Sequence, residues 1–100
     1  MKIKAFISQP MRGKNDEDIK KERDMINVWC KARNYDVIDT IFDFGDESPI
    51  YYLAKSIEAM SKANIVIFMN GWEEARGCRI EYEVAKAYGK EIMILSDINK

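Results

Sequence analysis

The sequence has 100 residues, of which 47% are hydrophobic and 33% are charged, as in an ordinary globular domain. Its 16 basic and 17 acidic residues leave a net charge of −1, without the basic excess of a nucleic-acid-binding surface, so we expect no DNA or RNA partner. No apolar run approaches the roughly 20 residues of a membrane span, and the N-terminal stretch MKIKAFISQP lacks the apolar segment of a signal peptide. We therefore expect one cytoplasmic domain over residues 1–100, with no membrane partner.

The residue types also narrow the possible chemistry. There is no histidine, and the two cysteines, Cys30 and Cys78, lie too far apart in sequence to form a CxxC pair. A structural zinc site is therefore not expected, and the commonest general base of enzymes is missing. We expect no metal and no cofactor. Carboxylates become the first candidates for any nucleophilic or acid–base role.

The first half of the chain predicts two strands separated by a helix. Residues 2–8 (KIKAFIS) form a short apolar run that ends in the loop SQPMRGK, which is typical of a buried strand. Residues 15–34 carry helix signals, with Asn15 as the N-cap, acidic residues in the first turn and basic residues in the last. Residues 35–40 predict a second strand. The expected core side of the helix carries Ile19, Ile26, Trp29 and Cys30.

The second half continues the alternation. After a loop, Ser48 and Pro49 indicate an N-cap followed by a proline at the first helical position. Residues 64–70 and 91–96 predict two more strands, with a further helix between them. The helix that begins at Pro49 has apolar residues at helical spacing, namely Ile50, Leu53, Ile57 and Met60.

Alternating strands and helices predict an α/β domain of the Rossmann or flavodoxin type, a three-layer sandwich around a four-stranded parallel sheet in the order 2-1-3-4. The first helix should cover one face of the sheet and the other two helices the opposite face. Ligands of such sheets bind where the strand order reverses, outside the carboxyl ends of the strands. That point lies between the loops SQPMRGK and NGWEEARG, so we expect a binding crevice there.

Glu81 is the most informative residue near this crevice. At about 100° per residue, Ile80, Val84, Ala87 and Tyr88 of the last helix form an apolar arc centred near Val84, and Ala85 widens it. Glu81 falls inside this arc, between Tyr88 and Ala85. A carboxylate on the buried side of a helix is costly unless something compensates it. Glu81 is therefore either a structural group, paired with Arg12 or Arg76 or held by loop amides, or a nucleophile or general base.

Residues 64–90 (NIVIFMNGWEEARGCRIEYEVAKAYGK) resemble the nucleoside 2-deoxyribosyltransferase family, which includes nucleotide N-glycoside hydrolases and short members that are often encoded by phages. The shared pattern is a glycine-containing loop, a helical glutamate, a small residue four positions later and a closing glycine. The Arg-Gly pair in the first loop is similar to one in the nucleotide-hydrolysing branch. The matching residues are Gly77, Glu81, Ala85 and Gly89, with Arg12 and Gly13 in the first loop.

The resemblance implies a small-molecule substrate, a 2′-deoxynucleoside or its 5′-monophosphate, and a homodimer or larger homo-oligomer. Glu81 would attack C1′ to form a covalent intermediate, which water or a second base would release. Aromatic residues in or beside loops also favour self-association, which could hide some of them in a contact, namely Phe42, Phe44, Tyr51, Tyr52 and Trp72. The implied substrate-binding residues are Ser8, Gln9, Arg12, Gly13, Asn70, Gly71, Trp72, Arg76 and Gly77.

Two departures from the family pattern favour a second hypothesis. Phe6 stands where the family often has a tyrosine that orients the nucleophile, and Ser56 where catalytic members usually have an aspartate. A non-catalytic module that binds a nucleotide or a nucleotide-derived signal in the same crevice is therefore the alternative. Three acidic residues of the loop before Pro49 could bind magnesium or supply a general acid, although solvation explains them best. They are Asp43, Asp46 and Glu47.

Overall fold

The computed structural model describes residues 2–11, 13–38 and 48–95. Its four strands form one sheet in the order β2-β1-β3-β4, and every pair is parallel, which confirms the predicted fold class and strand order. Among the described residues, no helix has the length and apolar character needed to cross a membrane. The elements are β1 (Ile3–Ser8), α1 (Asp16–Ala32), β2 (Tyr35–Val37), α2 (Pro49–Met60), β3 (Ile65–Phe68), the short 3-10 helix η1 (Trp72–Glu74), α3 (Arg76–Ala87) and β4 (Glu91–Ile94).

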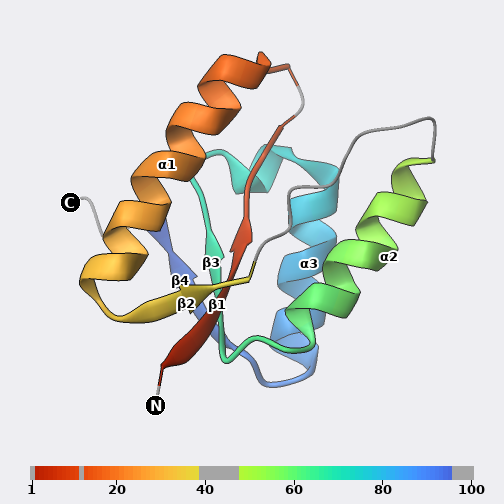
Figure 1. Cartoon of the computed structure of the whole chain (residues 1–100). Helices are drawn as coiled ribbons and strands as arrows, with labels where there is room; N and C mark the ends of the chain where they lie inside the picture. Colours follow the sequence, from red (N-terminus) through yellow and green to blue (C-terminus); the bar gives the residue numbers. More distant parts are fainter. Residues whose placement is uncertain (1, 12, 39–47, 96–100) are drawn as a thin grey trace.

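The helices cover the two faces of the sheet as the sequence predicts. Figure 1 shows α1 on one side of the sheet and α2 with α3 on the other. Alternate residues of β1 point to opposite faces, so Ala5 and Ile7 pack in the core cluster that includes α1. Phe6 belongs to the cluster of α2 and α3. Ser8 shares the face of Phe6, at the carboxyl end of the strand.

The predicted helix starts are partly confirmed. The Asn15 side chain accepts a hydrogen bond of 2.8 Å from the backbone N–H of Asp18, as an N-cap should. Ser48 precedes α2 and Pro49 begins it, but the Ser48 side chain makes no capping hydrogen bond. The proline supplies the helical φ without it.

The predicted buried side of α3 is right for Glu81 and Ala85, but its centre is displaced by roughly a quarter turn from Val84. Ile80 and Tyr88 were expected near the core, yet they are 39% and 80% exposed. The buried residues of α3 are Cys78, Glu81 and Ala85. Ala85 packs in the core cluster with Phe6 and Phe68 of the sheet, whereas Cys78 and Glu81 line the pocket. Glu81 thus lies in the middle of the buried face.

The expected core faces of the other two helices are right in part. Ile26 and Cys30 of α1 are buried, and Trp29 packs against them from the edge. On α2, Met60 is buried whereas Ile50 is exposed. The main surprise is on α1, where a charged residue, Arg23, is buried between Ile19 and Ile26 in the sequence.

The cap of α1 gives a first prediction. Asn15→Ala removes the acceptor for the Asp18 N–H and should lower the free energy of unfolding by about 1 kcal/mol, measured by urea denaturation. Asn15→Asp keeps an acceptor at the same position and should stay close to the wild type. Equal stability of the two variants would show that the cap contributes nothing.

Candidate functional site

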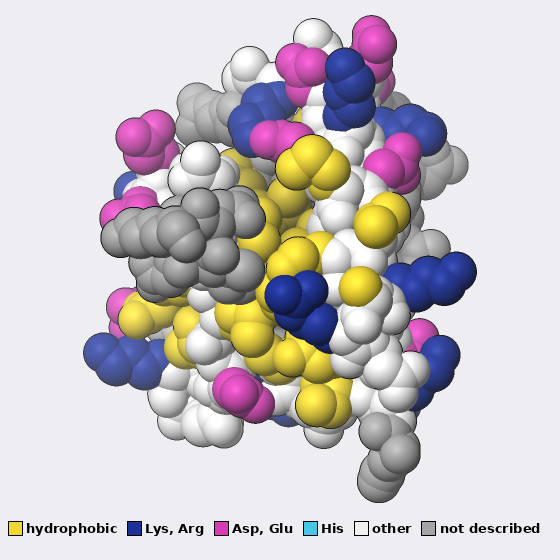
Figure 2. Space-filling model, turned by 90° about the vertical axis from the view of Figure 1, so that its left-hand side faces the viewer, with side chains coloured by type: hydrophobic (Ala, Val, Ile, Leu, Met, Phe, Trp, Pro, Cys, Tyr) yellow, Lys and Arg dark blue, Asp and Glu magenta, His cyan; other side chains and the backbone are white. Residues whose placement is uncertain are grey.

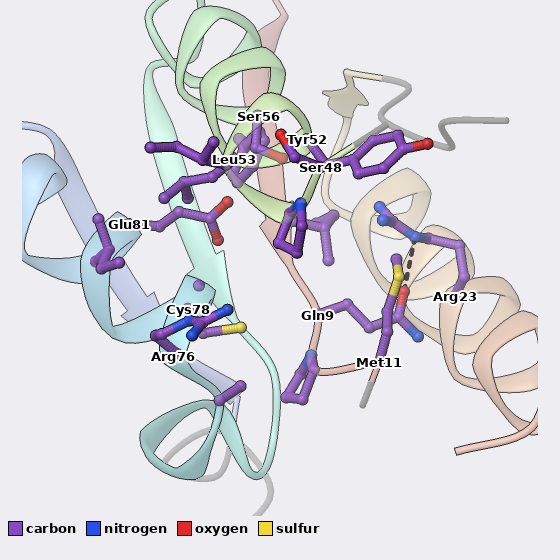
Figure 3. A pocket seen from close by; sticks show the side chains of 18 residues that line it. Gln9, Met11, Arg23, Ser48, Tyr52, Leu53, Ser56, Arg76, Cys78 and Glu81 are labelled. Carbon is purple, nitrogen blue, oxygen red and sulfur yellow. Dashed lines mark hydrogen bonds between the residues drawn. The ribbon is translucent and has the colours of Figure 1, made fainter. Parts of the chain in front are cut away.

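A cavity of about 650 Å³ opens at the carboxyl ends of the central strands, where the sequence predicts a crevice. Its walls come from the end of β1 and the loop that follows, from the first half of α2 and from the start of α3. Figure 3 shows Glu81 on one side of this pocket and Arg23 on the opposite side. Phe6 and Leu53 contribute to its apolar wall.

The Glu81 carboxylate is held by hydroxyl groups. Ser8 Oγ donates a hydrogen bond of 2.7 Å to Glu81 Oε1, in a buried position. Ser56 of α2 lies near the Glu81 carboxylate in Figure 3, and its hydroxyl lowers the pKa of Glu81, as that of Ser8 does. Among residues 2–11, 13–38 and 48–95, no cation forms a salt bridge with Glu81. The predicted pairing with Arg76 is therefore not formed, and Arg12 lies outside the described residues.

Burial changes the acidity of this carboxyl group. Glu81 is 7% exposed, and burial raises its pKa from 4.5 to about 7, against the opposing hydrogen bonds from Ser8 and Ser56. A carboxyl group with this pKa exists in both protonation states near neutral pH. It can act as a nucleophile or base when ionised and as an acid when protonated.

Cys78 lies close to Glu81 but is not a reactive thiolate at neutral pH. Burial raises the pKa of Cys78 to about 11, against the opposing hydrogen bond from Ser8, and the charge of Glu81 adds to the increase. The thiol therefore stays protonated. Glu81 is the ionisable group of this wall that changes charge near neutral pH.

The pocket wall opposite Glu81 contains two buried polar side chains that are hydrogen-bonded to each other, Gln9 and Arg23. The Gln9 side-chain amide donates to the carbonyl of Ile19 at 2.9 Å, which fixes its orientation. Its oxygen then accepts a hydrogen bond of 3.1 Å from Arg23 Nε. Gln9 and Arg23 are 8% and 5% exposed, and both line the pocket. The sequence analysis named Gln9 but missed Arg23.

A signal for Arg23 was present in the sequence. Arg23 stands four residues after Ile19 and three before Ile26, so it shares the apolar side of α1. The same spacing argument drew attention to Glu81. A charged residue on the apolar side of a helix is thus a useful marker at both walls of this pocket.

The structure brings together only some of the predicted binding residues. Arg76 and Gly77 line the pocket on the side of Glu81, and Gln9 lines the opposite side. Ser8 is bonded to Glu81 but is not part of the described lining. Gly13 and Asn70 are exposed and do not belong to its described lining. Lys14, in the same loop as Gly13, forms a salt bridge of 2.9 Å with Glu22 of α1.

The loop after β3 turns away from the pocket. Gly71 has a φ of 89°, a left-handed conformation that glycine adopts without strain, and it leads into η1. The Trp72 ring stacks on Tyr82 with a centroid distance of 4.7 Å and contacts Phe68 at 5.3 Å. Trp72 therefore packs against the core cluster that contains Phe68 and is not part of the described lining of the pocket.

The acidic residues considered for magnesium lie outside the described residues, at Asp43, Asp46 and Glu47. Within the described ranges, no group of three or more Cys, Asp or Glu side chains is arranged to hold a metal ion.

The raised pKa of Glu81 predicts how stability depends on pH. The folded state binds the Glu81 proton more tightly than the unfolded state, so this group stabilises the fold below about pH 4.5 and the stabilisation is lost as pH rises through about 7. In the Glu81→Gln variant, the side chain at position 81 cannot ionise, so the variant keeps its stability as pH rises. Relative to the wild type, its free energy of unfolding should rise by about 2 to 3 kcal/mol between about pH 5 and pH 8.

Urea denaturation of both proteins at the two pH values measures this difference. Glu83→Gln is the matched control, because Glu83 is exposed on the same helix. If Glu81→Gln is instead destabilised equally at both pH values, Glu81 serves as a structural hydrogen-bond acceptor.

Comparison with known proteins identifies a family but no activity. No curated protein and no solved structure matches the chain significantly, so the resemblance to nucleoside 2-deoxyribosyltransferases stays a prediction. A protein-family model does match, and it covers residues 3–94, which includes every strand and helix of the structure. The family is described as a domain of unknown function, DUF4406, and the chain belongs to it.

Proposed function

We propose that this protein cleaves or transfers the N-glycosidic bond of a 2′-deoxynucleoside or its 5′-monophosphate, with Glu81 as the nucleophile. The observation that carries the proposal is a buried carboxyl group in a pocket of about 650 Å³, with a pKa of about 7 and hydroxyl partners in place of a cation. A salt-bridged carboxylate would be a weaker nucleophile, because its charge would already be compensated. The resemblance of the Glu81 helix to the transferase family supports the same role.

The reaction follows from the chemistry of the anomeric carbon. The ionised Glu81 carboxylate attacks C1′, and the bond between C1′ and the base nitrogen breaks as a bond from C1′ to the carboxylate oxygen forms. The base leaves with the electron pair and takes up a proton from solvent water. A water molecule, or a second base, then attacks C1′ and loses a proton to solvent, and the Glu81 carboxylate departs in its original state.

The pocket suits a ligand of nucleoside size. Its volume falls in the range that small-molecule sites commonly have. Phe6, Pro49 and Leu53 supply apolar surface for a sugar or a base, while Gln9 and Arg76 supply polar contacts. In this proposal Glu81 meets the sugar, and the polar contacts orient the rest of the ligand.

A binding module without turnover is the second candidate. Phe6 favours it, because this buried residue has no hydroxyl to offer the Glu81 carboxylate. In that case, the pocket would hold a nucleotide or a nucleotide-derived signal unchanged. The two functions differ in one product, the free base.

Incubation with a panel of 2′-deoxynucleosides and their 5′-monophosphates, followed by chromatography, should detect released base. Glu81→Gln keeps nearly the same shape but loses the nucleophilic charge, so the rate should fall by several orders of magnitude, on the scale seen when a covalent nucleophile is removed. Glu83→Gln should retain the wild-type rate. Base release at the wild-type rate by folded Glu81→Gln would rule out Glu81 as the nucleophile.

Binding without base release would instead favour the second candidate. Isothermal calorimetry with the same panel shows whether the pocket binds any of these compounds.

We also propose that the protein is cytoplasmic and that it self-associates. The exposed apolar surface supports self-association. Met25 and Val28 of α1 are 68% and 70% exposed. Figure 2, which views the side that carries α1, shows hydrophobic side chains gathered in a band there. Tyr51 of α2 is also exposed. Of the other aromatic residues considered, Tyr52 and Trp72 are half-buried, whereas Phe42 and Phe44 lie outside the described residues.

Sedimentation at micromolar concentration should give a mass above that of the 11.7 kDa chain. Replacing both Met25 and Val28 by glutamate should return the monomer if the exposed part of α1 forms the contact, because burying two charges there is costly. A wild-type protein that is strictly monomeric would contradict self-association.

A further inference from the structure

Two serine hydroxyls converge on Glu81 from different elements. Ser8 ends β1, is 1% exposed and donates the 2.7 Å hydrogen bond to Glu81 Oε1. Ser56 lies in the middle of α2 and lines the pocket near the Glu81 carboxyl group, whose ionised form its hydroxyl favours. The carboxylate is therefore held between the sheet and α2, while α3 carries its backbone.

The Ser8 hydroxyl donates its hydrogen bond to Glu81. A hydroxyl group has one proton to donate. Cys78 stays protonated at neutral pH, so it does not compete as a negatively charged acceptor for that proton. Ser8 can therefore give its proton to Glu81, and an ionised Glu81 has only acceptor oxygens to receive it.

Hydrogen bonds from neutral donors favour the ionised form of a carboxyl group without cancelling its charge. A salt bridge would favour the ionised form more strongly, but its cation would also compensate the negative charge with which the carboxylate attacks a substrate carbon. Two hydroxyls thus keep a buried carboxylate available and aimed at the cavity. Phe6, which has no hydroxyl, packs beside Ser8 on the same strand and cannot serve in this way.

We propose that Ser8 and Ser56 are positioning residues, which favour the ionised form of Glu81 and direct its carboxylate into the pocket. This inference rests on the proposed function of Glu81 as a nucleophile. Neither serine contacts the reacting carbon in this scheme. Each acts through the carboxylate that it binds.

Other ionisable groups near Glu81 are few. The pocket is lined by Arg76 and Cys78 of α3, Arg23 of α1 and Tyr52 of α2. β3 has no ionisable side chain, and Lys4 of β1 is exposed at the opposite end of that strand. None of these described groups forms a salt bridge with Glu81, so the titration of Glu81 should respond directly to the loss of either hydroxyl.

The test measures the protonation of Glu81 without requiring turnover. Carbon NMR of protein with carboxyl-labelled glutamate follows the titration, and the Glu81 signal is identified by its loss in Glu81→Gln. Ser8→Ala and Ser56→Ala should each raise the Glu81 midpoint by about one pH unit, the size expected for losing a hydrogen bond to a charged group.

Two further variants separate positioning from simple packing. Ser56→Thr keeps the hydroxyl on the half-buried surface of α2 and should restore the wild-type midpoint. Ser61→Ala removes an exposed hydroxyl at the end of the same helix, bonded to the carbonyl of Glu58, and should leave the midpoint unchanged. An unchanged midpoint in folded Ser8→Ala or folded Ser56→Ala would overturn the proposal.

Base release gives the functional readout. Below the midpoint, Ser8→Ala should release base about tenfold more slowly than wild type, because one pH unit changes the ionised fraction by that factor. The deficit should shrink well above the midpoint. If wild type releases no base, the nucleophile proposal fails, whereas the NMR titration still decides whether the serines control Glu81.

Discussion

The hydrogen bond between Ser8 and Glu81 is the interaction on which the site depends. It joins the end of β1 to α3 across 73 residues of sequence, inside the layer between the sheet and its helices. Taking a carboxyl group out of water carries a large cost, and this bond offsets part of it. The remainder appears as a pKa of about 7, which makes Glu81 chemically versatile near neutral pH.

The fold explains why such a group can be placed beside a cavity. The central strands β1 and β3 run parallel, so their carboxyl ends meet at one edge while the chain leaves them toward opposite faces. α1 closes one side of the resulting space and α3 the other. The pocket is therefore a consequence of the strand order, and its two walls come from helices that are distant in sequence.

Each wall carries one buried charged residue held by a neutral polar side chain. Arg23 on α1 is bonded to Gln9, and Glu81 on α3 is bonded to Ser8. Both neutral partners lie at the end of β1, in consecutive positions whose side chains point to opposite faces of the sheet. A single short segment, Ser8 and Gln9, thus organises both sides of the pocket. This economy is useful in a chain of 100 residues, which has few elements available to build a site.

The sequence by itself determined the alternation of strands and helices, because strands and helices bury apolar residues at different spacings and Asn15 and Pro49 mark helix starts. The handedness of parallel crossovers then gave the strand order. The helical spacing of apolar residues around Glu81 also marked this residue as unusual. Only the tertiary structure decided which side of α3 faces the sheet, since the small residue Ala85 packs there and the larger Ile80 does not.

The partners within the site were likewise decided in three dimensions. Nothing in the local sequence connects Ser8 with Glu81, or shows that Trp72 would stack on Tyr82 instead of facing the pocket. Those contacts depend on how closely α2 and α3 approach the sheet, and that distance is set by packing of side chains from four elements at once. Periodicity along one helix identifies a buried charge; only the packed layers determine what compensates it.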